Sequence, residues 1–332
     1  MSILKMKKRP FVLSTATVVG EHENEGPLKN YFDMYDPKNK FGQDTWEKAE
    51  SEMNRHALRI ALDKANIKES DIDIIFGGDL LNQCCGTTFG IKDSNIPFYG
   101  IYGACSTFTL GLSLSAMSIN AGYYRRSAST ASSHFCSSER QFRTPVEYGG
   151  QRAPTSQWTV TGASCVILDN NEKSSGVYVN EVLAGRIVDF GIDDVNNMGA
   201  AMAPAAADTI KRYFDETDMS PCDFDIIATG DLGYEGYNIV KDLLKKENII
   251  LGDNYTDCGL LIYNRERQDM HAGGSGCGCS GVVTSGYFMN LFESKKIKDM
   301  LIISTGALLS STSTMQGLSI PGVAHLVRLT RI

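Results

Sequence analysis

The feature that most constrains the fold is an internal repeat. Three segments of the first half of the chain recur in the second half in the same order. Ser70 to Leu80 (SDIDIIFGGDL) is matched by Cys222 to Leu232 (CDFDIIATGDL), and Gly162 to Asp169 (GASCVILD) by Gly322 to Leu329 (GVAHLVRL). Between these segments, each half places a turn rich in Gly, Cys and Ser before a helix, at 103–106 and at 274–281. Three matches in one order indicate duplication of one βα unit of about 160 residues.

Helical and strand patterns alternate within each half. Apolar spacing predicts helices over 45–66 and 203–214, and short apolar runs predict buried strands such as 72–77. The segments 21–42 and 79–90 are interpreted as loops. Because parallel strands need helical crossovers, we expect two α/β halves, 1–170 and 171–332, packed about a pseudo-dyad with their glycine-rich turns converging.

Composition narrows the class of protein. The chain has 332 residues, 42% of them hydrophobic, and a net charge of −7 without a basic cluster, which argues against nucleic acid as a partner. Lys5 to Arg9 followed by an apolar run imitates a signal peptide, but no cleavage pattern follows and Pro10 begins a strand-like alternation. The uncharged segment 104–124 contains too many Ser and Thr residues for lipid. We therefore expect no signal peptide or transmembrane segment, synthesis in the cytoplasm and nine reduced cysteines.

Cys105 is the candidate reactive residue. It follows the strand-like run 96–101 and opens the long helical segment, where backbone N–H groups and the helix dipole stabilise a thiolate. The alternative is a buried cysteine that packs as a small hydrophobe.

Other motifs carry weaker signals. Cys84 and Cys85, like Cys277 and Cys279, lack the paired spacing of a zinc site, so no metal is predicted. The glycine turn lacks the lysine of a phosphate-binding loop. His134 and His271 are interpreted as structural. Three arginines are candidate cations for an anionic ligand or, equally, members of a solvated or subunit-contacting loop: Arg140, Arg143 and Arg152.

With these motifs, the chain resembles the thiolase and ketoacyl synthase superfamily over nearly its whole length. The resemblance implies a five-layer αβαβα sandwich in which Cys105 matches the acylated cysteine. The superfamily's histidine and asparagine positions are not matched, because this chain has Gly274 to Gly276 and Thr229 to Asp231 there. A serine cannot replace an imidazole as a base, and Asp231 would raise the pKa of a neighbouring thiol. Condensing activity is not expected; an acyltransferase that acylates Cys105 remains the alternative.

Three motifs are similar to those of a sporulation branch of this superfamily: 102–106, 155–164 and 271–281. This resemblance implies a protein that binds dipicolinic acid, free or as its calcium chelate. It also implies action with the membrane subunits of the SpoVA spore channel, in uptake during sporulation and release at germination. The protein would lie peripherally on the spore inner membrane, without a cofactor and with calcium only as part of the ligand. Superfamily members pair as dimers through the strand before the cysteine, here 97–101.

The ligand site is predicted between the two helix N-termini, where N–H groups and hydroxyls suit a flat aromatic dianion. Its predicted ligand-binding residues are Cys105, Ser106, Asp231, Ser275, Gly276, Cys277 and Gly306. The segment 308–321 is expected to cover this slot. A scaffold without a ligand is the third hypothesis.

Overall fold

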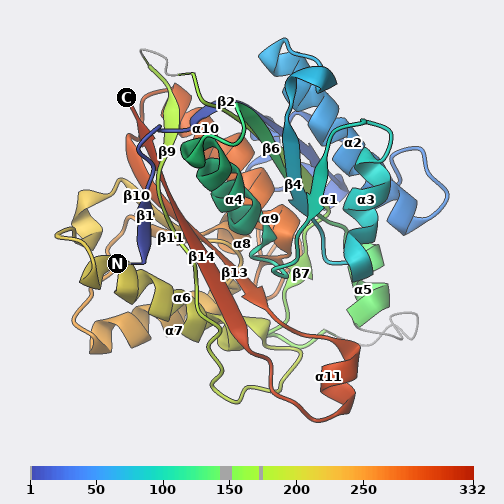
Figure 1. The fold of residues 1–332 in the computed structure, drawn as a ribbon. Coiled ribbons are helices and arrows are strands. Elements are labelled where there is room, and N and C mark those ends of the chain that lie inside the picture. The colour runs from blue at the N-terminus through green and yellow to red at the C-terminus, as the bar shows by residue number, and fades with distance from the viewer. Residues whose placement is uncertain (1, 143–151, 172–174) are drawn as a thin grey trace.

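Each half of the chain forms a five-stranded sheet with the same strand order (Figure 1). The computed structural model describes residues 2–142, 152–171 and 175–332. In the first half the order is β5 (Phe98–Gly100), β4 (Ile74–Gly78), β6 (Arg126–Ser133), β8 (Gly162–Asp169) and β2 (Phe11–Val19). In the second half it is β11 (Tyr255–Asp257), β10 (Ile226–Thr229), β13 (Asp299–Ala307), β14 (Gly322–Arg331) and β9 (Val177–Leu183).

The strand directions repeat as well. In both halves the first three strands of the order run parallel, and the last two are joined by antiparallel pairing. The repeated sequence segments form equivalent strands, β4 and β10 in one case and β8 and β14 in the other. The repeat seen in the sequence is therefore a repeat of topology.

The two sheets are not fully separate. Strands β2 and β9 pair antiparallel at Phe11 and Tyr178, whose rings also make an edge contact with centroids 5.4 Å apart. The hydrogen-bonded path consequently runs through a 12-stranded sheet, with β1 (Ile3–Lys5) added to β9 and β3 (Met34–Tyr35) added to β2. The sequence predicts two sheets but not this junction at their edges.

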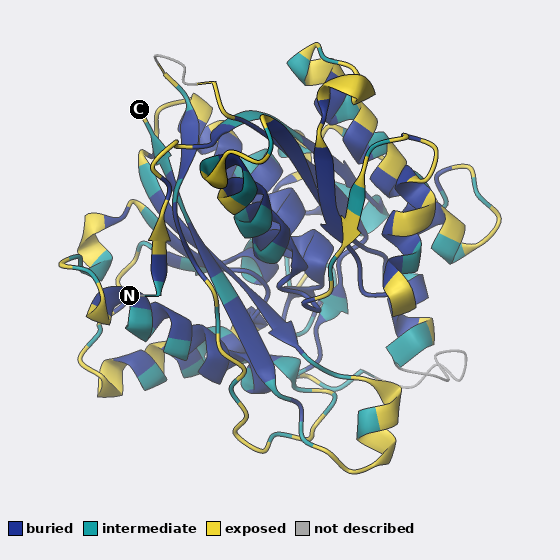
Figure 2. Ribbon diagram, viewed as in Figure 1, coloured by how far each residue is buried: buried dark blue, intermediate teal, exposed yellow. Residues whose placement is uncertain are grey.

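Helices lie outside and between the sheets, which gives the expected five layers (Figures 1 and 2). The first sheet is covered on its outer face by α2 (Trp46–Ala65), and the second by α6 (Met198–Asp215) with α7 (Gly233–Lys246) packed beside it. The central layer contains α4 (Thr107–Ala121), which contacts strands of both halves, and α9 (Cys277–Val282). Three separate hydrophobic clusters fill the spaces between these layers.

Helix α2 shows why the sequence pattern predicted its bounds so closely. The Thr45 side chain caps the helix by accepting a hydrogen bond from the Lys48 amide, and Asn66 ends it in the left-handed conformation. Ala49, Met53 and Ala57 are fully buried against the sheet. Local capping and an apolar stripe agree in this segment, so its structure could be predicted from sequence.

Two segments predicted as loops contain helices. Residues 79–90 include α3 (Cys85–Ile91), which packs on α2; an added Cβ at Gly90 would meet the Ser51 carbonyl oxygen at 2.6 Å. Residues 21–42 include α1 (Glu21–Glu25), β3 and a 3-10 turn, Lys29–Tyr31. Glu23 is buried there, where it accepts a hydrogen bond from the Thr161 amide at 3.0 Å. Contacts with distant parts of the chain, absent from a local pattern, specify both helices.

The remaining described elements are short. They are α5 (Phe135–Phe142), β7 (Trp158–Thr159), α8 (Cys258–Leu261), β12 (Gly274–Ser275), a π-helical segment (Val283–Phe288), α10 (Met289–Glu293), α11 (Ser311–Met315) and three 3-10 turns, Glu69–Asp71, Asn82–Cys84 and Pro221–Asp223. Strands β7 and β12 pair parallel as a separate two-stranded sheet. The division into domains at residue 170 stays a prediction.

Candidate functional site

Cys105 lies in a tight turn between β5 and α4. Ala104 has a positive φ of 48°, and side-chain bonds brace the turn: Ser106 donates to the Gly103 carbonyl at 2.6 Å and Thr107 to the Ala104 carbonyl at 2.6 Å. The amides of Ser106 and Thr107 donate to the same two carbonyls. These amides are therefore occupied by the turn and do not point at the sulfur as free donors.

The second glycine-rich turn meets the first at Ser275, as predicted. The Ser275 hydroxyl oxygen lies 3.8 Å from Cys105 Sγ and donates to Asp231 Oδ2 at 3.1 Å. Gly276, with φ of 102°, donates its amide to the same carboxylate oxygen at 3.0 Å. The two halves of the chain thus bring a thiol, a hydroxyl and a carboxylate together.

Asp231 is a buried carboxylate held by several donors. It follows β10, and its other oxygen accepts a hydrogen bond from the Thr305 hydroxyl at 2.6 Å. Burial raises its pKa to about 6, although the hydrogen bonds from Thr305, Cys105, Gly276 and Ser275 oppose the shift. Near neutral pH this group carries negative charge beside Cys105.

The Cys105 thiol is therefore kept protonated. Burial, and after it the charge of Asp231, raises its pKa well above the ordinary value for cysteine. This contradicts the interpretation of Cys105 as an activated thiolate and agrees with the expected effect of Asp231. A protonated thiol is a poor nucleophile, so Cys105 has the position of a nucleophile at a strand-to-helix turn but is not held as a thiolate.

Both candidate histidines are engaged away from the sulfur. His134 is buried, its Nε2 lies 2.8 Å from the Asn39 carbonyl oxygen, and burial lowers its pKa to about 4. The Nδ1 atom of His271 lies 2.8 Å from the Ala153 carbonyl oxygen, and its Nε2 is 3.1 Å from Asp269. Neither lines the cavity beside Cys105, and their interpretation as structural residues stays a prediction.

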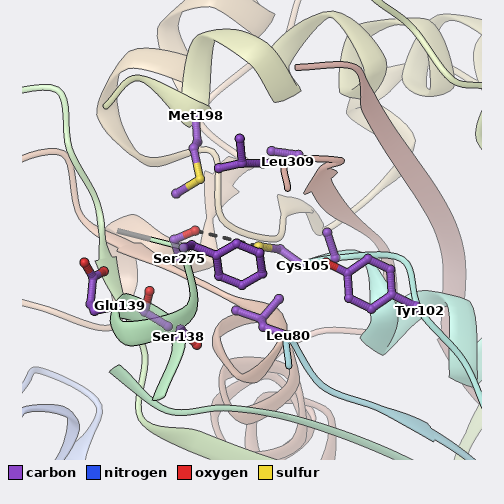
Figure 3. Close-up of a pocket in the computed structure, with 12 residues that line it drawn as sticks. Leu80, Tyr102, Cys105, Ser138, Glu139, Met198, Ser275 and Leu309 are labelled. Carbon is purple, nitrogen blue, oxygen red and sulfur yellow. Dashed lines mark hydrogen bonds between the residues drawn. The ribbon is translucent and has the colours of Figure 1, made fainter. Parts of the chain in front are cut away.

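A small cavity opens beside Cys105 and Ser275 (Figure 3). Its volume is about 40 Å³, or about 450 Å³ when the space of its open mouth is included. Met198 and Leu309 lie on the side opposite Leu80 and Ser138. The lining residues are Leu80, Tyr102, Ala104, Cys105, Ser138, Glu139, Phe142, Thr159, Met198, Ser275, Ala307 and Leu309. The space that water-sized groups can reach is small, so a ligand larger than a few water molecules must extend into the mouth.

Two of the seven predicted ligand residues, Cys105 and Ser275, line this cavity. Ser106, Asp231, Gly276, Cys277 and Gly306 do not; they belong to the surrounding turns and strands. The thiol of Cys277 donates to the Ser132 carbonyl at 2.7 Å, and a Cβ on Gly306 would lie 2.3 Å from the Gly103 carbonyl oxygen. Their assignment as ligand-binding residues remains a prediction.

Most of the cavity wall was not predicted. Leu80, Phe142, Met198 and Leu309 come from four distant segments and carry no chemical motif. Tyr102 and Ala104 belong to the cysteine motif at 102–106 and Thr159 to the motif at 155–164, and these motifs were the signals available. Leu309 lies in the segment expected to cover the slot.

The predicted cations lie elsewhere in the described structure. Arg140 pairs with Glu47 at 3.2 Å, and Arg152 lies 3.7 Å from Asp269 and over the Trp158 ring. Arg143 falls outside the described residues. The charged side chain that the described residues supply to the cavity wall is Glu139.

Two further observations on the described residues concern metal binding and membrane-spanning helices. No group of three or more potential metal-binding side chains was found. No described helix is both long and apolar enough to cross a membrane.

Doubled halves, a cysteine turn and a converging glycine turn define the thiolase-like class, and comparison with solved structures agrees. 3-Oxoacyl-[acyl-carrier-protein] synthase III from Aquifex aeolicus VF5 is 14% identical with a TM-score of 0.58, covering 96% of this chain and 99% of its own. A variant of Xanthomonas campestris OleA is 12% identical with a TM-score of 0.62, and the match covers 98% of this chain and 99% of that protein. The tetronic acid condensing enzyme AbyA1 is 14% identical with a TM-score of 0.59, and the match covers 96% of this chain and 99% of that protein. At these identities the likeness shows the fold.

Sequence comparison gives the family. The family model of stage V sporulation protein AD (SpoVAD) matches residues 2–330. Stage V sporulation protein AD of Bacillus subtilis (strain 168) is 40% identical over 321 residues, which are 97% of this chain and 94% of that protein. This chain belongs to the stage V sporulation protein AD family and is a sporulation protein.

Proposed function

We propose that the chain binds dipicolinic acid, free or as its calcium chelate, at the mouth of the cavity beside Cys105 and Ser275. In this role it acts with the membrane subunits of the SpoVA channel, peripherally on the spore inner membrane, in uptake during sporulation and release at germination. The observation that supports binding over catalysis is the protonated thiol: Cys105 faces a cavity but has a buried carboxylate, not an imidazole, behind it.

The residues that line the mouth suit an aromatic ligand with polar groups. Tyr102, Phe142, Met198 and Leu309 supply apolar surface, and Cys105 and Ser275 supply a thiol and a hydroxyl at the inner end. Ligand sites commonly combine such apolar walls with a few polar groups. Because the enclosed volume is small, we propose that the ring lies in the mouth with one edge toward Ser275.

Charge favours the chelate as one of the two ligand forms. Asp231 lies behind Ser275 at the inner end of the cavity, so a free dianion placed there meets a negative charge. In the chelate, calcium neutralises the two carboxylates of dipicolinate and removes this repulsion.

Calorimetric titration tests the proposal with dipicolinate alone and with equimolar calcium. Cys105→Ala and Ser275→Leu change the inner end of the cavity, and we expect the second variant to lower affinity at least tenfold by filling it. Cys222→Ala is the matched control, because Cys222 is exposed and does not line the cavity. Unchanged affinity in both site variants contradicts the proposed position of the ligand.

The alternative function is acyl transfer onto Cys105, favoured by the location of the cysteine at a strand-to-helix turn. Incubation with acyl-CoA donors followed by intact-mass measurement separates the two. A stoichiometric adduct that disappears in Cys105→Ser supports the enzyme, whereas the raised pKa of the thiol predicts no adduct.

We also propose a homodimer. Strand β5 ends the described sheet order, so one of its edges can pair with a second copy, and Tyr99 within this strand is exposed. Light scattering that gives the mass of one chain at micromolar concentration contradicts this.

A further inference from the structure

Two segments of the second half form one exposed surface at the mouth of the cavity. Residues 184–197 connect β9 to α6, and residues 308–321 connect β13 to β14 and include α11; both lie at the bottom of Figure 1. The Ile320 amide donates to the Ile192 carbonyl at 2.7 Å, and the Ser319 hydroxyl donates to Asp189 at 2.6 Å. The two segments are therefore held together as a unit.

This unit exposes large apolar side chains. Ile187 is 68% exposed, Phe190 65%, Leu318 54% and Met315 81%; we call these four residues the rim surface. Single exposed apolar residues are ordinary, but four on two hydrogen-bonded segments are typical of an interaction site. Water-exposed Phe and Met side chains gain free energy when a partner covers them.

The surroundings of the rim surface are acidic. The first segment carries three carboxylates, those of Asp189, Asp193 and Asp194. Its one cation, Arg186, lies 3.9 Å from the carboxylate of Asp208. The second segment carries no charged residue. An anionic lipid surface would be repelled by these carboxylates, and a second copy of the same surface would bring like charges together. The charge pattern fits a protein segment that carries apolar side chains and Lys or Arg.

The rim surface adjoins the cavity. Met198 begins α6 directly after the first segment, and Leu309 belongs to the second; both line the cavity wall (Figure 3). A partner seated on the rim surface would lie beside the opening through which a ligand enters. Short cytoplasmic loops of membrane proteins combine apolar flanks with an excess of Lys and Arg, which is the chemistry required.

We infer that the rim surface docks a basic, apolar cytoplasmic loop of a membrane subunit, and that docking places this subunit at the mouth of the cavity. The inference rests on the proposed function for the source of the partner. The docked loop would control or receive the ligand at the point where it leaves the cavity.

The test measures binding of the full chain to the detergent-solubilised, purified membrane subunits of the SpoVA system, each titrated separately. We expect Phe190→Ser with Leu318→Ser to weaken binding to one subunit at least tenfold, as loss of two central apolar contacts does. Asp193→Lys with Asp194→Lys should weaken it by a similar factor, and 0.5 M salt should reduce the difference. Tyr123→Ser is the matched control, because Tyr123 is 81% exposed just beyond the far end of α4.

Three outcomes overturn the inference. One is binding of the double variants to the subunits with wild-type affinity, or no binding of the wild type to any of them. Another is sedimentation with vesicles of 7:3 phosphatidylcholine and phosphatidylglycerol that depends on Phe190 and Leu318. The third is a change of mass in light scattering for the rim variants, which would assign the surface to a second copy.

Calorimetry on the same proteins separates this inference from the proposed function. The rim variants should retain dipicolinate affinity, because their side chains do not line the cavity. If the wild type binds a subunit through the rim surface but binds no dipicolinate, the proposed ligand is wrong and the docking surface stands. If it binds dipicolinate but no subunit, the docking surface is wrong and the ligand stands.

Discussion

Replacement of Asp231 with Asn should turn the Cys105 thiol into a more reactive group without changing the fold. Ser275 bridges the two residues, 3.8 Å from the sulfur and 3.1 Å from the carboxylate. Asparagine can keep this arrangement. Its carbonyl oxygen can accept the bonds from Ser275 and Gly276, and its amide can donate to the Thr305 hydroxyl, which serves equally as an acceptor.

The size of the effect follows from the separation of the charges. Cys105 also hydrogen-bonds to Asp231 directly, so about 7 Å, the sum of the two distances, is the upper limit of their separation. At this limit and an effective dielectric constant of about 20, two unit charges repel by about 2.4 kcal/mol, which is therefore the smallest repulsion expected. Its removal lowers the pKa of Cys105 and raises the thiolate fraction about 50-fold or more. Because a less basic thiolate is a weaker nucleophile, the reaction rate then rises about tenfold or more.

Alkylation by iodoacetamide between pH 7 and 9, followed by peptide mass spectrometry, measures this rate. Cys222 is an internal reference because it is exposed and precedes β10, whereas Asp231 follows this strand at its other end; Cys105→Ala identifies the labelled peptide. Equal rates at Cys105 in the wild type and in Asp231→Asn, with equal rates at Cys222, would refute the claim that the carboxylate holds the thiol protonated.

Two further predictions concern stability. Burial, with Asp79 nearby, raises the pKa of Glu50 from 4.5 to about 8; the folded protein therefore binds this proton more tightly than the unfolded chain, and the free energy of unfolding should fall as pH rises from about 4.5 to 8. Glu50→Gln should flatten this dependence in urea titrations, and a slope unchanged from the wild type contradicts the assignment. Gly306→Ala should destabilise the protein by about 1–3 kcal/mol because the new methyl group would meet the Gly103 carbonyl oxygen at 2.3 Å. Gly252→Ala, whose nearest contact is the Asn254 side chain at 3.3 Å, is its control, and an equal loss in both variants would show that the close approach is unimportant.

The cysteine turn bears on the proposal that the chain binds a ligand without condensing activity. The cysteine turn is fixed by backbone bonds and by the close approach of Gly306, so its shape does not depend on a reactive sulfur. Asp231 reverses the electrostatics, because a carboxylate disfavours the thiolate that an imidazolium would stabilise. We therefore regard the retained cysteine as a polar wall residue rather than a nucleophile.

The sequence by itself determined the duplicated topology, the bounds of α2 and the meeting of Cys105 with Ser275. Each of these follows from a local pattern: repeated apolar strands, a helix cap with an apolar stripe, and turns that precede helices. Because the two halves are duplicates, their equivalent elements meet at the pseudo-dyad, and this places the two glycine-rich turns next to each other.

Only the tertiary structure decided the protonation of Cys105 and the composition of the cavity. The effect of Asp231 on a neighbouring thiol is expected from the sequence, but burial, the larger cause of the raised pKa of Cys105, is a property of the folded protein. Met198, at the start of α6, and Leu309 reach the cavity from segments that are joined by long-range hydrogen bonds. Solvent exclusion and contacts between distant segments exist only after packing, and for that reason no sequence pattern predicted the burial of the thiol or most of the cavity wall.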